Sequence, residues 1–588
     1  MQLKELLFGV SIEYVFGTTS VSIGNVTADS RQAEPNALFV AIRGEFHDGH
    51  SYIGDAVKKG AIAILCEELP IKQVEGITYV QSFQCRSAYA VIASNYHNRP
   101  SAKLSLIGVT GTNGKTSIVQ LLFEVYQHLG FSVGKLSTIA NAINEHHYPA
   151  THTTPDPMEI NSLLARMVEA DVSYCFMEVS SHGIDQRRIE GLHFSGGIFT
   201  NLTHDHLDYH KTFESYRDTK KKFFDKLPAT AFALSNHDDK NGKYMLQNCA
   251  AKQHSYALKN TAEFKAKILE HDFSGMQLRI DGKETWVALV GDFNASNMLA
   301  VYACTQLLGE NVDQSLSALS AVEPVSGRFN VVSGGHPVRA IVDYAHTPDA
   351  LKTAIFNIKE EYPLSKVSLV FGCGGNRDKY KRSVMGSIAN KYCDNIYITD
   401  DNPRLENPKL IRNQIKKGIK KNKFIEIPSR AKAILTAVNE LNSGDVLIVA
   451  GKGHENYQEY KRKKFFSDKS TILNAIKNKN LILSKSIKTN NLNEVFKKNF
   501  LRKNTIIKSA SINSKKIDKN SIFIGVKGKK YDGNFYVDEA FRNGANLSIT
   551  NKKSSNTKNI YNKNPINLLS TISSRYRKSL NSNTIAIT

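Results

Sequence analysis

The chain has 588 residues, of which 41% are hydrophobic, and a formal charge of +22. This length is too great for one hydrophobic core. A domain typically has about 100 to 200 residues, so we predict three to five domains. The basic excess is local, because residues 471–588 hold 23 Lys and Arg against 5 Asp and Glu, a net of +18, which leaves +4 for the rest. No nucleic-acid motif and no basic-aromatic interleaving accompany the charge, so we predict no nucleic-acid partner.

Cysteine spacing and the N-terminus narrow the class of protein further. The seven cysteines form no C-x-x-C pair, so the sequence indicates neither a disulfide framework nor a cysteine zinc site. The first residues, MQLKELLFGV, lack the basic and apolar regions of a signal peptide, and no run of about 18 apolar residues occurs. We therefore expect a soluble, cytoplasmic protein without membrane insertion.

One segment occurs twice along the chain. Residues 29–61 match residues 513–545 without gaps at an offset of 484, and Ser30 and Gly44 are among the residues with identical counterparts. Identities at several glycines are an improbable coincidence. We interpret the C-terminal segment as a second copy of the N-terminal domain.

Residues 105–117, SLIGVTGTNGKTS, read as an apolar strand, a Gly-rich turn and the start of a helix. Gly111 and Gly114 allow backbone N–H groups to approach phosphate oxygens, Lys115 neutralises phosphate charge, and Thr116 can ligate Mg²⁺. Val109 stands where the general G-x-x-x-x-G-K-[ST] pattern has its first glycine. The order of strand, loop and helix still predicts a nucleotide-phosphate site.

Polar residues follow two later strand-like runs. Glu178 comes directly after four mainly apolar residues in YCFMEV, at a position typical of the metal carboxylate in phosphoryl-transfer enzymes. Downstream, TNLTHDHLDYH gathers three histidines and two aspartates within residues 204–210. Read alone, this cluster fits a zinc site or a polar loop, and zinc has no support from cysteine or from an H-E-x-x-H spacing.

Further strand-like runs alternate with helical stretches, the pattern of a parallel α/β sheet: GGIFTNL, KVSLVFG, NIYITD and DVLIVAG. An apolar and Gly-containing run predicts a joint between two such units near residue 335. At 399–408, TDDNPRLENP read alone is a solvated turn, since Asn-Pro starts turns and Asp and Asn bond their own backbone. The second copy reaches NTIAIT at 583–588, which we expect to be a strand that ends before any second phosphate loop.

Ten motifs, in this order, resemble those of the Mur ligases: TGTNGKT, MEVSSHGIDQRR, NLTHDHLDYH, YRDTKKKFF, GDFNASNMLA, SGRF, DYAHTPDAL, GGNRDKYKR, DNPR and GKGHENYQ. The resemblance covers about residues 1–480 and is strongest with the members that ligate diaminopimelate. The C-terminal segment resembles the first domain of another member, the ligase that adds D-alanyl-D-alanine. Asn513 and Asn534 replace Asp29 and His50 there, so UDP binding by the second copy stays open.

The resemblance implies an α/β protein with three domains and a partial fourth. These are a UDP-substrate-binding domain (1–100), a central P-loop ATPase domain (101–335), a Rossmann-like amino-acid-binding domain (336–480) and the second copy (481–588). It also implies a monomeric, ATP- and Mg²⁺-dependent ligase of peptidoglycan synthesis that joins meso-diaminopimelate to UDP-MurNAc-L-Ala-D-Glu through an acyl phosphate. The alternatives are ligation of L-lysine, a folylpolyglutamate synthetase-like ligase, and a nucleotide-binding scaffold with a basic tail.

The resemblance assigns roles residue by residue. ATP is assigned to Gly111, Thr112, Asn113, Gly114, Lys115, Thr116, Ser117, Asn297, Arg328 and Asp343. The catalytic and metal-site residues are Lys115, Thr116, Glu178, His206 and Lys220, the last as a carbamate, although Lys220 read alone is an exposed lysine in a run of three. The UDP-linked substrate is assigned to Ser30, Thr153, Thr154, Ser180, Gln186 and Arg188. His152 departs from the asparagine found in related ligases. Diaminopimelate is assigned to Arg377, Asp401, Asn402, Pro403, Arg404, Gly451 and Glu455.

The chemistry of meso-diaminopimelate agrees with this last set. Its distal carboxylate favours a planar guanidinium such as that of Arg404, and its distal ammonium needs acceptors such as Glu455. Lysine lacks that carboxylate, so we expect it to leave Arg404 buried and unpaired, at a cost of about 1–3 kcal/mol.

Overall fold

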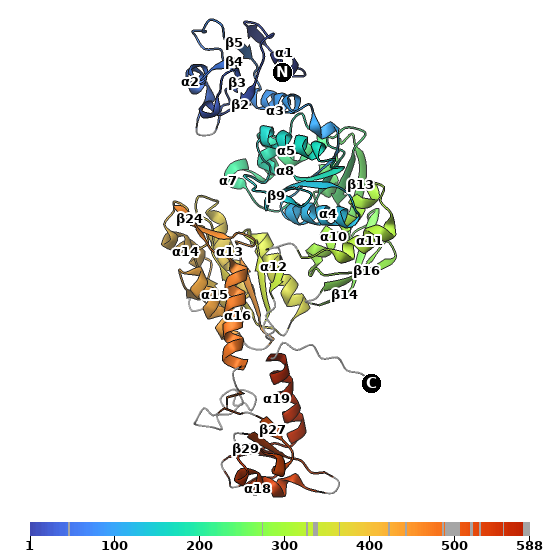
Figure 1. Ribbon diagram of the computed structural model, residues 1–588, viewed down its shortest axis with the longest axis vertical. Coiled ribbons are helices and arrows are strands. Elements are labelled where there is room, and N and C mark those ends of the chain that lie inside the picture. The colour runs from blue at the N-terminus through green and yellow to red at the C-terminus, as the bar shows by residue number, and fades with distance from the viewer. Residues whose placement is uncertain are drawn as a thin grey trace. The chain divides into compact units, whose positions relative to one another are not determined.

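The computed structural model describes residues 1–44, 47–272, 275–324, 327, 329–332, 339–363, 365–420, 424–441, 444–484, 487–488, 506–507, 509–517, 521–528, 531–554, 556 and 558–579. Three sequence predictions lie outside these residues: the ATP residue Arg328, the joint near residue 335 and the strand at 583–588. The chain divides into two units (Figure 1). Unit 1 is Met1–Phe329 with Ala345–Glu361 and Arg377–Lys381, and unit 2 is Asn330–Tyr344, Tyr362–Asn376 and Arg382–Thr588.

Unit 1 begins with a sheet of five described strands in the order β1-β5-β4-β3-β2. Their bounds are β1 Tyr14–Phe16, β2 Asn25–Thr27, β3 Ala37–Val40, β4 Ala61–Cys66 and β5 Thr78–Gln81, and all pairs except β1 with β5 are parallel. Helices α1 (Leu3–Leu6), α2 (Ile53–Lys58) and α3 (Cys85–Tyr96) flank it, with short turns η1 (Ser30–Gln32) and η2 (Gly49–Tyr52). Strands β3 and β4 are apolar on both faces, so two separate hydrophobic clusters cover them.

The second sheet of unit 1 has eleven described strands in the order β16-β15-β14-β13-β12-β11-β6-β10-β7-β8-β9. They are β6 Ser105–Thr110, β7 Val133–Leu136, β8 Asn141–Ile143, β9 His146–Tyr148, β10 Tyr174–Glu178, β11 Gly196–Phe199, β12 Phe232–Asn236, β13 Lys252–Ala257, β14 Phe264–Asp272, β15 Gly275–Ile280 and β16 Lys283–Val287. The sheet is parallel from β7 to β14, as the strand-helix alternation predicted, and antiparallel strands extend both ends. Strands β6, β10 and β11 are neighbours, so the loops at their carboxyl ends meet at one edge of the sheet.

Helices cover both faces of this sheet (Figure 1). They are α4 Lys115–His128, α5 Pro157–Glu169, α6 Ser181–Asp185, α7 Leu207–His210, α8 Phe213–Asp225, α9 Gly242–Met245, α10 Asp292–Leu307 and α11 Val312–Ala321. Helix α4 packs with α10 and α11, and α3 of the first sheet packs on α5. Helix α12 (Pro348–Glu361) also belongs to unit 1.

Unit 2 is built on a sheet of six described strands in the order β17-β18-β22-β19-β20-β21, of which all but β17 run parallel. They are β17 Asn330–Val332, β18 Arg339–Asp343, β19 Val367–Phe371, β20 Asn395–Ile398, β21 Phe424–Glu426 and β22 Val446–Ala450. Its helices are α13 Tyr380–Tyr392, α14 Pro408–Lys416, α15 Arg430–Glu440 and α16 Asp468–Ser484, and β23 (Tyr457–Tyr460) and β24 (Arg462–Phe465) form a hairpin. The carboxyl ends of β20 and β22 carry TDDNPR and GKGHE.

The C-terminal part of unit 2 repeats the elements of the first sheet. Strands β27 (Ser509–Ser511), β28 (Ser521–Gly525) and β29 (Ala545–Thr550) correspond to β2, β3 and β4, and the same turns and helix lie between them. Strand β30 (Asn559–Tyr561) completes the sheet. The bounds of β27, β29, α18 (Val537–Arg542), η4 (Ser514–Lys516) and η5 (Gly533–Tyr536) equal those of β2, β4, α2, η1 and η2 plus 484. Helix α19 (Pro565–Ser579) lies beside this sheet, and β25 (Ile487–Lys488) and β26 (Ile506–Ile507) precede it.

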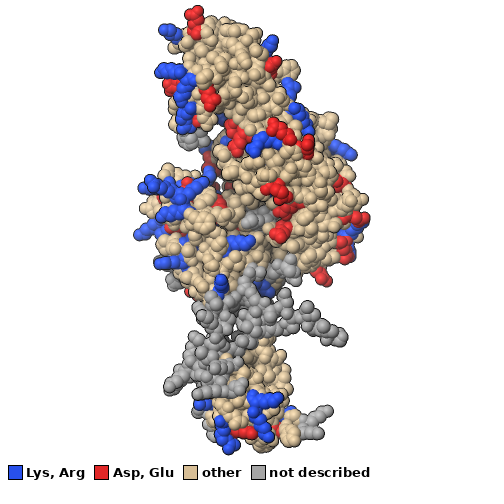
Figure 2. All heavy atoms as spheres, viewed as in Figure 1, with Lys and Arg blue, Asp and Glu red and all other residues tan. Residues whose placement is uncertain are grey.

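The repeat keeps its turn geometry while its polar residues change. His50 lies 2.6 Å from the Asp48 carboxylate and accepts the backbone N–H of Glu67 at 3.0 Å. Asn534, at the offset position, donates to Asp532 at 2.5 Å and accepts a backbone N–H at 3.2 Å. An amide thus replaces an imidazole with both bonds retained. Lys and Arg side chains gather on the face of this segment that Figure 2 shows.

Two further sequence predictions concern cysteine and the membrane. All seven cysteines are buried and free of disulfide bonds, as their spacing predicted. In the described part of the chain, no helix combines the length and the apolar character that a membrane span needs.

Candidate active site

The phosphate loop joins β6 to α4, and two of its glycines adopt backbone conformations that favour glycine. Gly111 has a φ of +152° and Gly114 a φ of +89°. A Cβ atom on Gly111 would lie 1.9 Å from Thr200 Oγ1, and one on Gly114 would lie 2.8 Å from Asn297 Oδ1. Larger residues do not fit at either position, and the loop lies beside Asn297, one of the residues assigned to ATP.

Side chains that follow β11 hold the middle of the loop. Thr200 Oγ1 donates to the Asn113 carbonyl at 2.6 Å, and Asn201 Oδ1 accepts from the Asn113 N–H at 2.9 Å. The hydroxyls of Thr112 and Tyr216 lie 3.1 Å apart. Thr116 and Ser117 are buried in the first turn of α4. These bonds fix the shape of the loop before any ligand binds.

Glu178 ends β10 with its side chain fully buried. Its carboxylate accepts hydrogen bonds from Thr116 Oγ1 at 3.0 Å, from Ser137 Oγ at 2.7 Å and from the Thr138 backbone N–H at 2.8 Å. Thr138 Oγ1 in turn donates to Thr153 Oγ1 at 3.1 Å. A buried carboxylate needs such donors, and the bonds connect two residues assigned to the metal with one assigned to the substrate.

Two ammonium groups converge on one carbonyl oxygen of the phosphate loop. The Gly111 carbonyl accepts from Lys115 Nζ at 2.8 Å and from Lys220 Nζ at 2.9 Å. Lys220 is 1% exposed, so the alternative reading of Lys220 as a surface lysine is wrong. Burial, together with the charge of Lys115, holds the pKa of Lys220 well below its ordinary value.

His206 precedes α7 with a φ of +55°. Its ring centroid lies 4.9 Å from that of His182, and its Nε2 lies 3.5 Å from the Asp205 carboxylate. Partial burial lowers the pKa of His206, so the imidazole is neutral at neutral pH, as a metal ligand has to be. These contacts place His206 among aromatic neighbours rather than in the hydrogen-bonded group around Glu178.

Four residues assigned to the UDP-linked substrate form one hydrogen-bonded group next to Glu178. Thr154 Oγ1 donates to the Glu178 carbonyl at 2.9 Å and accepts from the Ser180 N–H at 2.9 Å. Arg188 donates to the Thr154 carbonyl at 2.7 Å and to Gln186 Oε1 at 2.7 Å through Nη2. The carboxyl end of β10 therefore presents an arginine and an amide beside Glu178.

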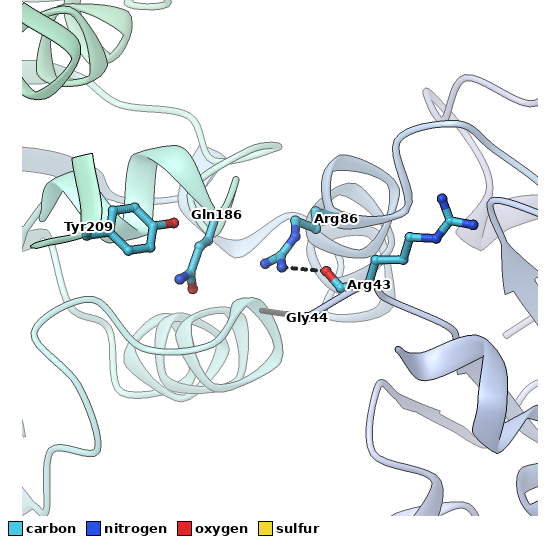
Figure 3. Close-up of a pocket in the computed structure, with 5 residues that line it drawn as sticks. All are labelled: Arg43, Gly44, Arg86, Gln186 and Tyr209. Atoms are coloured by element: carbon cyan, nitrogen blue, oxygen red, sulfur yellow. Dashed lines mark hydrogen bonds between the residues drawn. The ribbon is translucent and has the colours of Figure 1, made fainter. Parts of the chain in front are cut away.

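A cavity of about 420 Å³ opens at Gln186 and is lined also by Arg43, Gly44, Arg86 and Tyr209. Figure 3 shows the Arg86 side chain between Gln186 and Arg43, and the Arg43 guanidinium directed away from Gln186. Arg86 donates to the Arg43 carbonyl at 2.7 Å. Sequence reasoning missed Arg86 because it lies in α3, outside every motif. Ser30, in η1, is not among the described residues that line this cavity.

In unit 2, a buried lysine connects residues assigned to the amino acid. Lys452 Nζ donates to Asn402 Oδ1 and to Glu455 Oε2, both at 2.9 Å, and Asn402 Nδ2 donates to the same Glu455 oxygen at 2.7 Å. Lys452 is completely buried. Gly451 and Glu455, close to it in the sequence, were predicted to bind the amino acid. Lys452 was not predicted, although a lysine between two glycines after a buried strand indicates a functional position.

Arg404 has partners within the chain. Its Nη1 donates to the Gly375 carbonyl at 2.8 Å, and its Nε lies 3.3 Å from the Glu459 carboxylate. Its side chain is 25% exposed. The expectation that lysine would leave Arg404 buried and unpaired is therefore wrong, because Glu459 is an internal partner that lies 55 residues away in the sequence.

The remaining assigned residues are spread over the two units. The backbone carbonyl of Asp343 accepts the Gly451 N–H at 3.0 Å. The backbone carbonyl of Pro403 accepts the Glu406 N–H at 3.0 Å. Asp401 lies 3.8 Å from the buried Arg430. Arg377 belongs to unit 1, whereas the other residues assigned to diaminopimelate belong to unit 2. Of the residues assigned to ATP, Asn297 belongs to unit 1 and Asp343 to unit 2.

The residues around Glu178 fit Mg²⁺. The Thr116 hydroxyl and the Glu178 carboxylate supply oxygen, the donor type that this ion prefers. Among the residues that the structure describes, no group of three or more His, Cys, Asp or Glu side chains is placed to hold a metal ion. Mg²⁺ does not need such a cage, because it keeps several waters and is held by one or two carboxylates together with substrate phosphates.

A phosphate loop between β6 and α4, with a buried carboxylate at the end of the neighbouring parallel strand, defines a nucleotide-binding enzyme of the phosphate-loop class. Three family models match: "Mur ligase family, catalytic domain" over residues 22–102, "Mur ligase middle domain" over 109–305 and "Mur ligase, glutamate ligase domain" over 327–453. The chain belongs to the Mur ligase family. Members of this family use ATP.

The similar proteins include two ligases with the same name, UDP-N-acetylmuramoyl-L-alanyl-D-glutamate--2,6-diaminopimelate ligase. The one from Cytophaga hutchinsonii is 47% identical over 480 residues, which are 81% of this chain and 99% of that protein. The one from Bacteroides fragilis is 48% identical over 482 residues, with the same coverage. A solved structure of a ligase with this name is 27% identical, with a TM-score of 0.58, and covers 82% of this chain and 99% of its own.

Proposed function

We propose that this protein uses ATP to join meso-diaminopimelate to UDP-MurNAc-L-Ala-D-Glu. The observation that carries the proposal is the identity of 47–48% over 99% of the length of two ligases named for that reaction. The hydrogen-bonded groups around Glu178 and Asn402 support it, because each surrounds residues that the reaction requires.

The UDP end of the substrate enters the cavity beside Arg86. The Arg86 guanidinium donates to a neutral carbonyl and lies beside an amide and a phenol. Such a group suits a diphosphate, which arginine binds through paired hydrogen bonds. Thr153, Thr154, Ser180, Gln186 and Arg188 then hold the muramoyl dipeptide, so that its D-glutamyl carboxylate points towards the phosphate loop.

The first chemical step transfers the γ-phosphoryl group of ATP to that carboxylate. The substrate oxygen attacks phosphorus, the bond to the β,γ-bridging oxygen breaks, and ADP leaves. Lys115 exchanges the Gly111 carbonyl for phosphate oxygens and neutralises the charge that develops on them. The product is an acyl phosphate, whose carbonyl carbon is a good electrophile because phosphate is a good leaving group.

Thr116 and Glu178 would hold one Mg²⁺, and His206 and Lys220 would serve a second. When bound, these ions would supply charge screening between the phosphates and the carboxylates. Lys220 is the residue we propose to be carbamylated. The Lys220 ammonium first loses a proton. The neutral amine then adds to CO₂, the new N–C bond forms and a second proton leaves, so that a buried cation becomes a carboxylate. The low pKa that burial gives Lys220 supports this step.

The second step forms the amide. The amine of diaminopimelate attacks the acyl carbon, the tetrahedral intermediate expels phosphate, and the amine loses a proton. Asn402, Arg404 and Glu455 hold the distal end of the amino acid, and Lys452 holds Asn402 and Glu455 in place.

The proposed domains are 1–100 for the UDP end, 101–335 for ATP, 336–480 for the amino acid, and 481–588 as a second copy of the first. The equal element bounds at an offset of 484 support the last assignment.

The test is phosphate release by the purified protein with the UDP-linked dipeptide and with meso-diaminopimelate, L-lysine or no amino acid. We expect turnover with diaminopimelate that exceeds turnover with lysine. Faster turnover with lysine would contradict the proposed specificity, and no phosphate release with either would contradict the proposed reaction. A scaffold function predicts that Lys115→Ala is harmless, whereas we expect it to abolish ligation.

A further inference from the structure

Arg404 pairs with a carboxylate, Glu459, that is not part of any of the family motifs. Glu459 lies in β23, outside DNPR and GKGHE. The backbone N–H of Arg404 donates to the Glu459 carbonyl at 2.9 Å, and the Glu459 N–H donates to Asn402 Oδ1 at 3.0 Å. Main-chain bonds thus fix Glu459 beside the DNPR loop, with its carboxylate 3.3 Å from the guanidinium of Arg404.

Both members of the pair are reachable by a ligand. The side chains of Arg404 and Glu459 are 25% and 28% exposed. Glu455, the other carboxylate of this loop, is 14% exposed, and one of its oxygens already accepts from Lys452 and from Asn402. Lys452 therefore shares the charge of Glu455, and Glu459 is a second carboxylate that a ligand ammonium can reach.

The distal end of meso-diaminopimelate carries a carboxylate and an ammonium on one carbon atom. A cation and an anion held side by side are complementary to that arrangement, because the substrate carboxylate replaces Glu459 at Arg404 while the substrate ammonium takes Glu459. Each protein charge then exchanges one partner for another, and none is left unpaired.

We propose that Glu459, the ion-pair partner of Arg404, is a specificity-determining residue that binds the distal ammonium of the amino-acid substrate. This inference rests on the proposed function, since it names the group that reads one end of the proposed substrate. It adds Glu459 to the residues that hold that end, with Arg404 reading the carboxylate and Glu459 the ammonium.

Three amino acids that differ only at the distal carbon test this division. Meso-diaminopimelate has both groups, L-lysine has the ammonium alone, and L-2-aminopimelate has the carboxylate alone. The experiment measures kcat/KM for each with the full chain, with Glu459→Gln and with Arg404→Met. Glu169→Gln, an exposed carboxylate in α5, is the matched control.

In Glu459→Gln we expect kcat/KM to fall about tenfold for diaminopimelate and for lysine, the size of one charged contact. For 2-aminopimelate we expect it to rise several-fold, because Arg404 no longer has a competing carboxylate. Arg404→Met should show the complementary pattern, with losses for the two carboxylate-bearing substrates and little change for lysine.

The opposite signs make the inference refutable. Equal effects of Glu459→Gln on all three amino acids, or no effect on any, would overturn it while the wild-type turnover with diaminopimelate still supports the proposed function. If the wild type shows no turnover with any amino acid, the proposed function fails first. In that case, the same division of roles is tested by calorimetric binding of the three amino acids, and equal affinities in Glu459→Gln would overturn it. Far-UV circular dichroism of each variant checks folding.

Discussion

Replacing Lys452 by methionine tests whether a buried cation positions the amino-acid site. Lys452 is fully buried and donates to Asn402 and Glu455 at 2.9 Å. Methionine keeps a similar volume but removes two charge-assisted hydrogen bonds, each worth about 1.5–3 kcal/mol. It also leaves the Glu455 carboxylate without its cation, and breaking one partner of a buried pair costs about 3–5 kcal/mol. Because Glu455 is 14% exposed, water recovers part of this loss.

We therefore expect the free energy of unfolding of unit 2 to fall by about 3 kcal/mol, the lower end of that range. About 1.4 kcal/mol lost from positioning would raise KM for diaminopimelate tenfold, with a smaller change in KM for ATP. Urea denaturation and initial rates with each substrate varied measure the two quantities. Lys464→Met, at an exposed position of β24, is the control. A loss below about 1 kcal/mol with an unchanged KM would refute the reasoning, since values of that size are typical of exposed pairs.

Three further predictions concern unit 1. Lys220→Ala should lower turnover by about 100-fold or more, the size of a lost electrostatic contact in catalysis, and added formate or acetate should restore part of it; full activity in this variant would remove the carbamate from the mechanism. Glu178→Gln should raise the Mg²⁺ concentration needed for half-maximal turnover at least tenfold, which a metal titration measures, and an unchanged titration would exclude Glu178 from the metal site. Burial lowers the pKa of Lys135 to about 8 from 10.5, so the unfolded chain binds more protons between these values, and stability should rise with pH across pH 8–10.5 by up to about 1.4 kcal/mol per unit. Lys135→Met should abolish that rise relative to the wild type, and parallel pH profiles of the two proteins would contradict it.

The sequence predicted the parts of the fold that depend on local patterns. The strand before Gly111, the helix after Lys115 and the strand that ends at Glu178 follow from apolar runs and glycines, and the structure has all three. The antiparallel strands at the ends of the large sheet were not predicted. At one end, β14, β15 and β16 pack against α10 and α11, and such tertiary contacts are not visible in a local pattern.

Burial of charged side chains was the harder problem. In KKK at 220–222, Lys220 and Lys221 are buried and Lys222 is exposed, and Tyr216, Lys220 and Phe223 recur at helical spacing on the buried face of α8. That periodicity was visible in the sequence and would have identified Lys220 without a family. The pairing of Arg404 with Glu459 was not visible, since no local pattern connects residues 55 positions apart.

The carbonyl of Gly111 affects the binding free energy of a nucleotide at the proposed ATP site. Because Lys115 already donates to this oxygen, nucleotide phosphate enters by exchanging acceptors, and the binding free energy contains only the difference between the two interactions of Lys115. The contact with Lys115 therefore does not by itself give the loop a high affinity for ADP. When the product leaves, Lys115 returns to an acceptor that is part of the chain, so each turnover ends with the loop in its starting arrangement.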